Sequence, residues 1–490
     1  MAAKALMFQG TGSDVGKSLF VAGLCRLASK RGISVRPFKP QNMSNNAAVT
    51  FDNGEIGRAQ ALQALAAGVQ PTIHMNPILL KPETENGSQI VVQGSLYGHA
   101  TAKQYQRMKA DLFSFVMDSF EKIREEADLV LIEGAGSPAE INLRTNDIAN
   151  MGFATVANVP VVLIGDIDRG GIIASIVGTK AVLSDIDQAQ IKGFVINKFR
   201  GDVSLFSDGV VQIEKYTKWK GLGVIPWFDG ASKLPAEDAM GLKTIVNSEK
   251  NEIVVAVPQL SRIANFDDLD PLRMERGVGL ILVRPGEVIP VDADIILLPG
   301  TKSTIGDLMF LREQGWHIDI ASHVRRGGSV LGLCGGYQML GKKISDPMGI
   351  EGSKKEIDGL GFLDVETILT SKKTLSSVMG KDTMFNTDIS GYEIHIGKTT
   401  GSDCDRPIIS LVKDGKVKFD GASTHDGRIM GSYVHGIFAS NSFRSAFLKN
   451  FGLRKEKCTD FNWEVENTLD KLADHLEKYI NIKSLFELAR

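Results

Sequence analysis

A glycine-rich segment near the N-terminus has the composition of a phosphate-binding loop. It comprises Gly10, Thr11, Gly12, Ser13, Asp14, Val15, Gly16, Lys17 and Ser18. Glycines let backbone N–H groups converge on phosphate oxygens, and the N-terminus of a following helix adds a favourable dipole. Lys17 can reach the β- and γ-phosphates of a nucleotide, and Ser18 can bind Mg²⁺. Thr11 stands where the standard spacing has glycine, so an ordinary tight turn is the alternative interpretation.

Polar residues at the ends of neighbouring apolar runs extend this candidate site. A magnesium–nucleotide site needs an acid at the end of an adjacent strand, and Glu133 follows four apolar residues. Asp166 ends the next apolar run and is a weaker candidate for the phosphate or metal, with a helix N-cap as the alternative. Asn197 is a candidate for the nucleotide base. Lys39 is a candidate for phosphate or a substrate carboxylate, unless it is simply a solvated lysine.

A second site is predicted around a cysteine. Cys334 follows an apolar run and precedes Gly335 and Gly336, and small neighbours permit a strained strand-to-helix turn that exposes the sulfur. Because a free thiol has a pKa of about 8.5, it needs a helix N-terminus and a base to react at neutral pH. His435 is the candidate base, and the amides of Gly300 and Gly335 are candidates for an oxyanion hole. A buried core cysteine is the alternative.

Two series of alternating strands and helices are expected to position these residues. The first has strands at 5–9, 35–38, 129–132, 161–164 and 193–196, and helices at 16–30, 56–67 and 101–126. The second has strands at 253–257, 295–298, 330–333 and 431–434, with a helix from 337. Continuous apolar runs suit parallel strands that are covered on both faces. We therefore predict two doubly wound α/β domains.

The domain boundaries follow from changes in composition. We expect a nucleotide-binding domain over 1–232, a polar linker over 233–250, a second domain over 251–445 and a helical extension over 446–490. In the extension, apolar residues recur at three- to four-residue spacing, as in an amphipathic helix. We expect this stripe to pack on the second domain, with a subunit contact as the alternative.

Composition favours a globular protein without nucleic-acid or membrane partners. Of 490 residues, 43% are hydrophobic and 23% charged, and the formal net charge is −2. The four cysteines are scattered, which fits a reducing compartment, and the glycine-rich loop begins too early to leave room for a signal peptide. We expect a cytoplasmic protein, and the sequence does not indicate its oligomeric state.

The sequence combines a predicted nucleotide-binding half with a half that carries a candidate nucleophilic thiol. This combination resembles known families. The segment around Cys334 resembles the nucleophile turn of class I glutamine amidotransferases, and the N-terminal half resembles dethiobiotin synthetase-like P-loop ligases. The whole chain resembles the cobyric acid synthase family. The segments that carry this resemblance are 37–46, 54–60, 76–82, 133–143, 165–171 and 196–202.

The resemblance implies a glutamine-hydrolysing ligase with small-molecule substrates. It implies amidation of the b, d, e and g carboxylates of adenosylcobyrinic acid a,c-diamide to cobyric acid, with ATP, Mg²⁺ and glutamine as the ammonia donor. ATP would convert each carboxylate into an acyl phosphate, because a carboxylate oxygen is too poor a leaving group for attack by ammonia. Cys334 would form a thioester with glutamine, with His435 as general base and then acid.

The sequence departs from the class I pattern after the histidine. A glutamate usually stands two residues further on, but Ile437 occupies that position, so the group that orients His435 is unassigned. Glu393 is a weak candidate, with a structural ion pair as the alternative. The amide-rich segment 41–45 replaces the aspartates in which the a,c-diamide synthases resemble one another, and makes Asn42 and Asn45 weaker candidates for substrate binding.

Other functions stay open at this point. The chain could instead be a cobyrinic acid a,c-diamide synthase, or another ligase–glutaminase fusion such as a cell-wall amidotransferase. The mass of the product distinguishes these enzymes from a cobyric acid synthase. A non-catalytic protein that senses nucleotide and glutamine belongs to a different class, and loss of glutamine hydrolysis on Cys334→Ala would exclude it.

Overall fold

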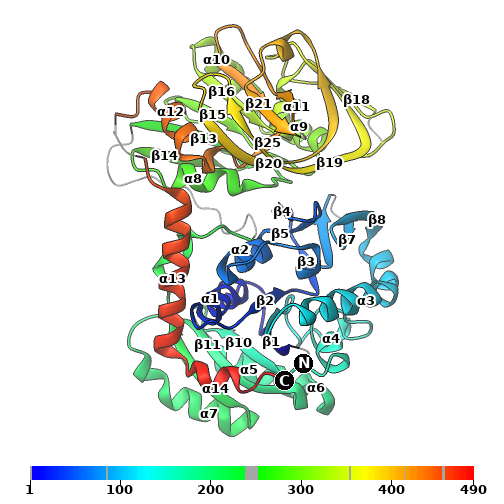
Figure 1. Cartoon of the computed structure of the whole chain (residues 1–490), viewed down its shortest axis with the longest axis vertical. Coiled ribbons are helices and arrows are strands. Elements are labelled where there is room, and N and C mark those ends of the chain that lie inside the picture. The colour runs from blue at the N-terminus through cyan, green and yellow to red at the C-terminus, as the bar shows by residue number, and fades with distance from the viewer. Residues whose placement is uncertain (1–2, 84–86, 238–251, 353–354, 414, 455–457) are drawn as a thin grey trace. The chain divides into compact units, whose positions relative to one another are not determined.

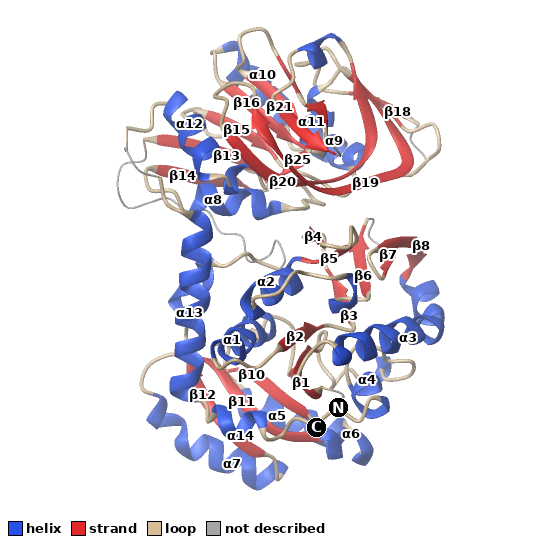
Figure 2. Cartoon of the chain, in the orientation of Figure 1, coloured by secondary structure: helices blue, strands red, loops and turns tan. Residues whose placement is uncertain are grey.

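The computed structural model describes residues 3–83, 87–237, 252–352, 355–413, 415–454 and 458–490. The chain forms two compact units (Figure 1). The first unit comprises Met1–Ser44, Thr50–Glu237 and Val465–Arg490, and the second comprises Asn45–Val49 and Asp238–Glu464. Helices flank parallel sheets in both, which confirms the predicted α/β class (Figure 2).

The first unit is built on a six-stranded parallel sheet of order β12-β11-β10-β1-β9-β2. Its strands are β1 (Lys4–Gly10), β2 (Val35–Phe38), β9 (Leu129–Glu133), β10 (Val161–Asp166), β11 (Ile191–Phe199) and β12 (Lys220–Pro226). Their apolar residues are almost wholly buried, as expected of strands covered on both faces. Because the strands are parallel, their carboxyl ends share one edge, where the loop after β1 lies beside the ends of β9 and β10.

Helices and smaller strands complete the first unit. The helices are α1 (Lys17–Lys30), α2 (Arg58–Ala67), α3 (Ala102–Glu125), α4 (Met151–Val156), α5 (Ile172–Val182), α6 (Asp185–Gln190), α7 (Ser207–Thr217), α13 (Phe461–Tyr479, from Val465) and α14 (Ile482–Phe486). The further strands are β3 (Gln41–Met43), β5 (Glu55–Gly57), β6 (Ile78–Pro82), β7 (Gly87–Val92) and β8 (Ser95–Thr101). Of these, β3, β6, β7 and β8 form a four-stranded sheet.

From Val465 on, helix α13 packs on the first unit, which corrects our expectation that the whole extension over 446–490 packs on the second domain; its residues up to 464 belong to the second unit. Leu472 and Leu476 are buried against α1, where Gly23 lacks the Cβ that would meet both side chains. Ion pairs flank this seam: Lys30 Nζ lies 2.8 Å from Asp474 Oδ1, and Arg31 pairs with Glu477 at 2.6 Å. The spacing of apolar residues predicts a buried face, but it does not say which surface covers that face.

The second unit contains a second mainly parallel sheet, of order β14-β13-β15-β16-β24-β23. Its strands are β13 (Ile253–Pro258), β14 (Val278–Val283), β15 (Ile295–Leu298), β16 (Ser329–Leu333), β23 (Ala422–Ser423) and β24 (Ile429–Ser432). Its helices are α8 (Asp270–Arg273), α9 (Thr304–Glu313), α10 (Trp316–Arg325), α11 (Gly335–Leu340) and α12 (Asn441–Asn450). Only the short edge strand β23 runs antiparallel to its neighbour.

A further, largely antiparallel sheet is not predicted by the sequence. It contains β17 (Lys343–Ser345), β18 (Glu356–Asp358), β19 (Glu366–Asp382), β20 (Asp388–Thr400), β21 (Ile409–Lys413), β22 (Lys416–Asp420) and β25 (Val434–His435). The long strands β19 and β20 mix charged and apolar residues because much of their surface is exposed, so they lack a continuous apolar run. This sheet matters for the site because β20 pairs with β25, which carries His435.

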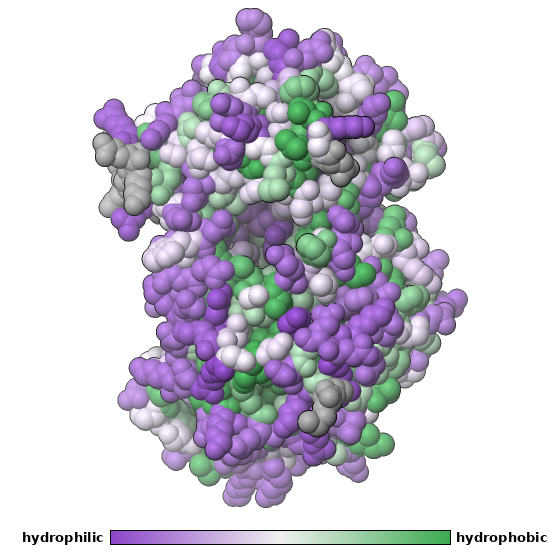
Figure 3. Space-filling model, in the orientation of Figure 1, coloured by the Kyte–Doolittle hydropathy of each residue, from purple (hydrophilic) through white to green (hydrophobic). Residues whose placement is uncertain are grey.

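The predicted linker over 233–250 lies mainly outside the described residues. Its first residues, up to Glu237, belong to the first unit. No helix within the described parts of the chain combines the length and apolar character needed to span a membrane. On the face drawn in Figure 3, apolar residues are interspersed among hydrophilic ones.

The packing of α13 leads to a stability prediction. Leu472→Ala should destabilise the first unit by about 2–5 kcal/mol, because the cavity left beside α1 adds to the lost burial. Hydrogen exchange should then be faster in the amides of α1, whereas the exposed Lys471→Ala should leave them unchanged. Faster exchange in the second unit instead of α1 would contradict this packing.

Candidate active sites

The glycine-rich loop joins β1 to α1 and folds around an ammonium group. Lys17 is 7% exposed, and its Nζ donates to the carbonyl oxygens of Gly12 (3.0 Å) and Gly136 (3.3 Å). Burial lowers the pKa of Lys17, although nearby carboxylates oppose that shift. Gly16 has a φ of +93°, and a Cβ there would collide with the side chain of Asn197. The loop therefore presents a positive charge and backbone amides in a form suited to phosphate.

An acid and a hydroxyl meet beside this loop. Ser18 Oγ donates to Glu133 Oε1 at 2.8 Å. The sequence predicts that these two side chains lie close together, because both are candidates for binding the same Mg²⁺. Glu133 is fully buried, and Gln63 Nε2 donates to its other oxygen at 2.6 Å. Lys39 Nζ lies 2.8 Å from Glu133 Oε1. Burial disfavours the charge on Lys39, but the carboxylates outweigh burial and raise its pKa above the usual range.

Glu237 joins these groups, and sequence reasoning missed it. Its carboxylate lies 2.5 Å from Ser18 Oγ and accepts from Lys39 Nζ at 2.7 Å. The sequence pattern places this residue in the polar linker. Because 219 positions separate Glu237 from Ser18, no spacing rule connects them, and only the fold brings them together.

Two predicted residues at neighbouring strand ends have other partners. Asn197 Nδ2 donates to the Val15 carbonyl at 2.8 Å, so the amide expected to read a base braces the loop instead. The sequence predicts Asp166 near the phosphate or metal. Its Oδ2 accepts from Lys198 Nζ at 2.9 Å and its Oδ1 from the amide of Asp168 at 2.8 Å. It therefore shapes the loop after β10, and it is not a helix N-cap either, since Gly171 holds that position in α5.

The amide-rich segment is less available to a substrate than its composition suggests. Asn42 is 2% exposed and its Nδ2 donates to Gln60 Oε1 at 2.8 Å, so it braces the helix that faces Glu133. This contradicts a direct role for Asn42 in substrate binding. Asn45 is partly exposed and belongs to the second unit.

Cys334 lies in a strained turn between β16 and α11. Its φ of 52° and ψ of −106° are unfavourable for a residue with a side chain. Gly332 and Gly336 allow the turn to close, since a Cβ on Gly336 would collide with the carbonyl of Leu298. Cys334 is 7% exposed and stands at the N-terminus of α11. Such a geometry is typical of a nucleophile.

The other predicted residues of this site gather around Cys334. A Cβ on Gly300 would lie 2.8 Å from Cε1 of His435, so the imidazole packs directly on that turn. A Cβ on Gly335 would lie 3.2 Å from the amide nitrogen of Thr301. The turn at 300–301 and the start of α11 are therefore adjacent, with backbone amides beside both reactive side chains.

Asp268 orients His435, and sequence reasoning missed this acid. It lies in the short helix η6 (Phe266–Leu269), and its Oδ2 is 2.7 Å from His435 Nδ1. The Gly436 amide donates to Asp268 Oδ1 at 2.5 Å. The imidazole and this carboxylate are both almost fully buried. Burial lowers the pKa of His435, but Asp268 and then Cys334 outweigh it and raise the pKa to about 10.

A tyrosine fixes the plane of the imidazole. The ring of Tyr392 stacks on that of His435, with centroids 5.3 Å apart and an angle of 17°. Tyr392 donates its hydroxyl proton to Asp267 at 3.0 Å, and Asn265 Nδ2 donates to that hydroxyl at 3.2 Å. The loop with Asp268 thus holds the histidine both directly and through Tyr392.

Glu393 is not the orienting acid. Successive residues of a strand face opposite sides, so Tyr392 turns towards His435 and Glu393 turns away. Glu393 pairs with Lys418 at 3.1 Å and lies 3.7 Å from His395. Burial raises its pKa, but these two neighbours outweigh burial and bring it to about 2. The structural ion pair is the correct interpretation.

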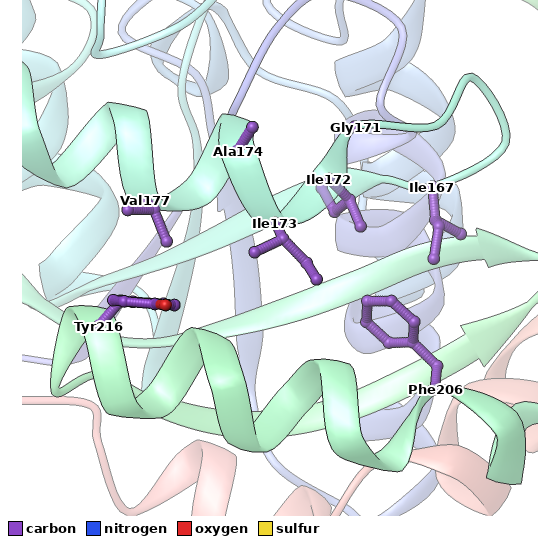
Figure 4. A pocket seen from close by; sticks show the side chains of 8 residues that line it. All are labelled: Ile167, Gly171, Ile172, Ile173, Ala174, Val177, Phe206 and Tyr216. Carbon is purple, nitrogen blue, oxygen red and sulfur yellow. The ribbon is translucent and has the colours of Figure 1, made fainter.

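An apolar hollow of about 530 Å³ lies apart from these groups in the first unit (Figure 4). Its lining comes from the loop after β10, from α5 and from the α7 region: Ile167, Gly171, Ile172, Ile173, Ala174, Val177, Phe206 and Tyr216. None of the predicted site residues lines it, and we assign it no role.

Comparisons with known proteins agree with the two sites. Residues 6–240 match the CobQ/CobB/MinD/ParA nucleotide binding domain, and residues 254–443 match the CobB/CobQ-like glutamine amidotransferase domain. The chain is 56% identical over 486 residues to a cobyric acid synthase of Brucella anthropi, covering 99% of this chain and 100% of the relative. It is 57% identical over 479 residues to one of Rhizobium johnstonii, covering 98% and 97%. PurLQS of Thermotoga maritima matches 44% of this chain and 97% of its own, with 20% identity and a TM-score of 0.30.

The pairing of Asp268 with His435 predicts a pH dependence. With a raised pKa, His435 stays protonated below about pH 10 and loses its proton above it. Asp268→Asn removes the carboxylate, so burial should lower the pKa of the histidine below its usual value. Glutamine hydrolysis should fall at least about 10²-fold, and its alkaline limb should move from near pH 10 towards neutral pH.

The measurement is kcat/KM for glutamine hydrolysis against pH. Asp292→Asn is the matched control, since it removes an exposed carboxylate from the same unit and should leave the profile unchanged. An unchanged alkaline limb in Asp268→Asn would show that another group sets the charge of His435.

Proposed function

This chain belongs to the cobyric acid synthase family, and we propose that its two units divide each amidation between them. It is a glutamine-hydrolysing carbon–nitrogen ligase of cobalamin biosynthesis. In the proposal, the first unit activates a corrin carboxylate with ATP and the second releases ammonia from glutamine. The observation that carries it is the presence of both reactive groups, Lys17 in a phosphate loop and Cys334 beside His435, in a chain that matches its relatives end to end.

Activation requires that a carboxylate oxygen attack the γ-phosphorus of ATP. The bond to the β,γ-bridging oxygen then breaks, ADP leaves, and an acyl phosphate forms. Lys17 is placed to stabilise charge on the β- and γ-phosphates, and Lys39 is a second buried ammonium on the same side. Both lysines contribute most at the transition state, because their positions are set before the nucleotide binds.

A magnesium ion fits beside this loop. The oxygens of Ser18 and Glu133 meet at 2.8 Å, and hard oxygen donors suit Mg²⁺. Gln63 holds the second oxygen of Glu133, so the first stays directed at Ser18. When bound, Mg²⁺ neutralises charge on the phosphates.

In the second unit, the proton of the Cys334 thiol passes to His435, and the sulfur attacks the side-chain amide carbon of glutamine. Amides of the 300–301 turn and of Gly335 stabilise the oxyanion, and His435 donates its proton to the departing ammonia. Water then hydrolyses the thioester, with His435 accepting a proton. Because Asp268 raises the pKa of His435 to about 10, the imidazole holds the proton taken from the thiol at neutral pH. It then gives this proton to ammonia, so His435 acts first as base and then as acid.

The acceptor is proposed to be the a,c-diamide of the corrin, amidated at its b, d, e and g carboxylates. Ammonia must arrive unprotonated, since ammonium has no lone pair to attack the acyl phosphate. Attack at the carbonyl carbon expels inorganic phosphate and leaves the amide. Four such rounds consume four molecules each of ATP and glutamine.

Product mass tests the acceptor. The chain should be incubated with ATP, Mg²⁺, glutamine and a corrin a,c-diamide, and successive products separated by mass. We expect four additions, each replacing a hydroxyl with an amino group. If no amide forms with either glutamine or ammonium salts, the proposed acceptor is wrong.

Loss of the thiol should separate the two half-reactions. Cys334→Ala should abolish amidation supported by glutamine yet retain amidation supported by ammonium salts, because the phosphate loop is untouched. The partly exposed Cys404 offers the matched control, and Cys404→Ala should keep both activities. Loss of both activities in Cys334→Ala would mean that this cysteine serves the fold or the ligase reaction.

A further inference from the structure

Glu237 reaches the phosphate loop from a distant part of the chain and is held there by its backbone. Ser44, which is 5% exposed, donates its hydroxyl proton to the carbonyl oxygen of Glu237 at 2.7 Å. The side chain then extends to Ser18 and Lys39, at 2.5 and 2.7 Å. A residue held at both ends has little freedom, so its carboxylate is a fixed part of this site.

The hydroxyl group of Ser18 has one proton for two close carboxylate contacts. Its hydroxyl has one proton, yet Oγ lies 2.8 Å from Glu133 Oε1 and 2.5 Å from Glu237 Oε2. An ionised carboxylate only accepts hydrogen bonds. Lys39 Nζ donates to Glu237 Oε1 at 2.7 Å, the contact that an ammonium group makes with a carboxylate. One of the two contacts therefore brings oxygen lone pairs together without a proton, an arrangement that a cation stabilises.

The position of Lys39 shows that the two carboxylates attract a positive charge. Its Nζ contacts Oε1 of both Glu133 and Glu237, at 2.8 and 2.7 Å. The two carboxylates thus face one ammonium group and share one hydroxyl. Lys17, by contrast, is held by backbone carbonyls within the loop. Glu237 therefore lies beside Glu133 and Ser18, the groups that would bind a cation.

We propose that Glu237 is a third protein ligand of the Mg²⁺ that accompanies ATP, beside Ser18 and Glu133. This inference rests on the proposed use of ATP by the first unit. Two carboxylates, a hydroxyl and substrate phosphates form the kind of donor set by which proteins hold this ion. The stretch of chain just before residue 238 thereby belongs to the ligase site rather than to a linker.

The test compares nucleotide affinity with and without the metal. Binding of the non-hydrolysable analogue AMPPNP is measured by calorimetry in saturating Mg²⁺ and in EDTA, and the ratio of the two affinities reports the contribution of the ion. In Glu237→Gln this ratio should fall about tenfold or more, since the variant keeps the shape but loses the charge. Affinity in EDTA should stay the same or rise, because a negative charge near the phosphates is gone.

Matched variants make the result decisive. Asp229→Asn removes an exposed carboxylate from the same stretch of chain and should leave the ratio unchanged. Glu237→Ala should lower the ratio as Glu237→Gln does, and an unchanged thermal unfolding transition of the first unit verifies that each variant is folded.

Two results would overturn the inference. If Glu237→Gln binds AMPPNP more tightly by the same factor in both conditions, Glu237 competes with phosphate instead of binding the ion. If neither affinity changes, the residue only supports the fold. Failure of the unaltered protein to bind AMPPNP at all would instead refute the proposed use of ATP.

Discussion

Each half of this protein buries a carboxylate beside the edge of a parallel sheet, and each carboxylate holds a positive charge in place. Glu133 holds Lys39, and Asp268 holds His435. A buried charge without a partner is costly, so neither member of either pair can be removed without a large penalty. The remaining geometry depends on these pairs, because they determine where the Lys39 ammonium and the His435 imidazole lie and which charge each carries.

The two pairs serve opposite chemical purposes. In the first unit, positive charge must be concentrated where an anionic nucleotide binds, so Lys17 and Lys39 are fixed by carbonyls and carboxylates before it arrives. In the second unit, a proton must be stored next to a thiol, so Asp268 keeps the imidazole charged at a pH where an isolated histidine is neutral. One protein thus holds an ammonium group for a polyanion and an imidazolium beside a thiol by the same electrostatic means.

Local features could be predicted from the sequence, and contacts between distant segments could not. The phosphate loop and the turn at Cys334 each lie within about a dozen consecutive residues, where glycine, an apolar run and a reactive side chain are sufficient signals. Asp268 and Glu237 lie 167 and 219 positions from the groups that they contact, so no spacing rule finds them. The same limit explains the error over α13: periodicity reveals an amphipathic helix, but its partner is a property of the fold. The misplaced roles of Asp166, Asn42 and Glu393 have a related cause, since a polar residue at a strand end can serve a neighbouring loop as readily as a ligand.

The protonation state of His435 tests the central claim most directly. In the intact chain labelled with ¹⁵N-histidine, the imidazole nitrogens of His435 should show the shifts of an imidazolium at pH 7 and titrate only near pH 10, with Nδ1–H bonded to Asp268. A neutral imidazole at pH 7 would contradict the account, because the buried carboxylate would then not be holding the charge on which this half of the reaction depends.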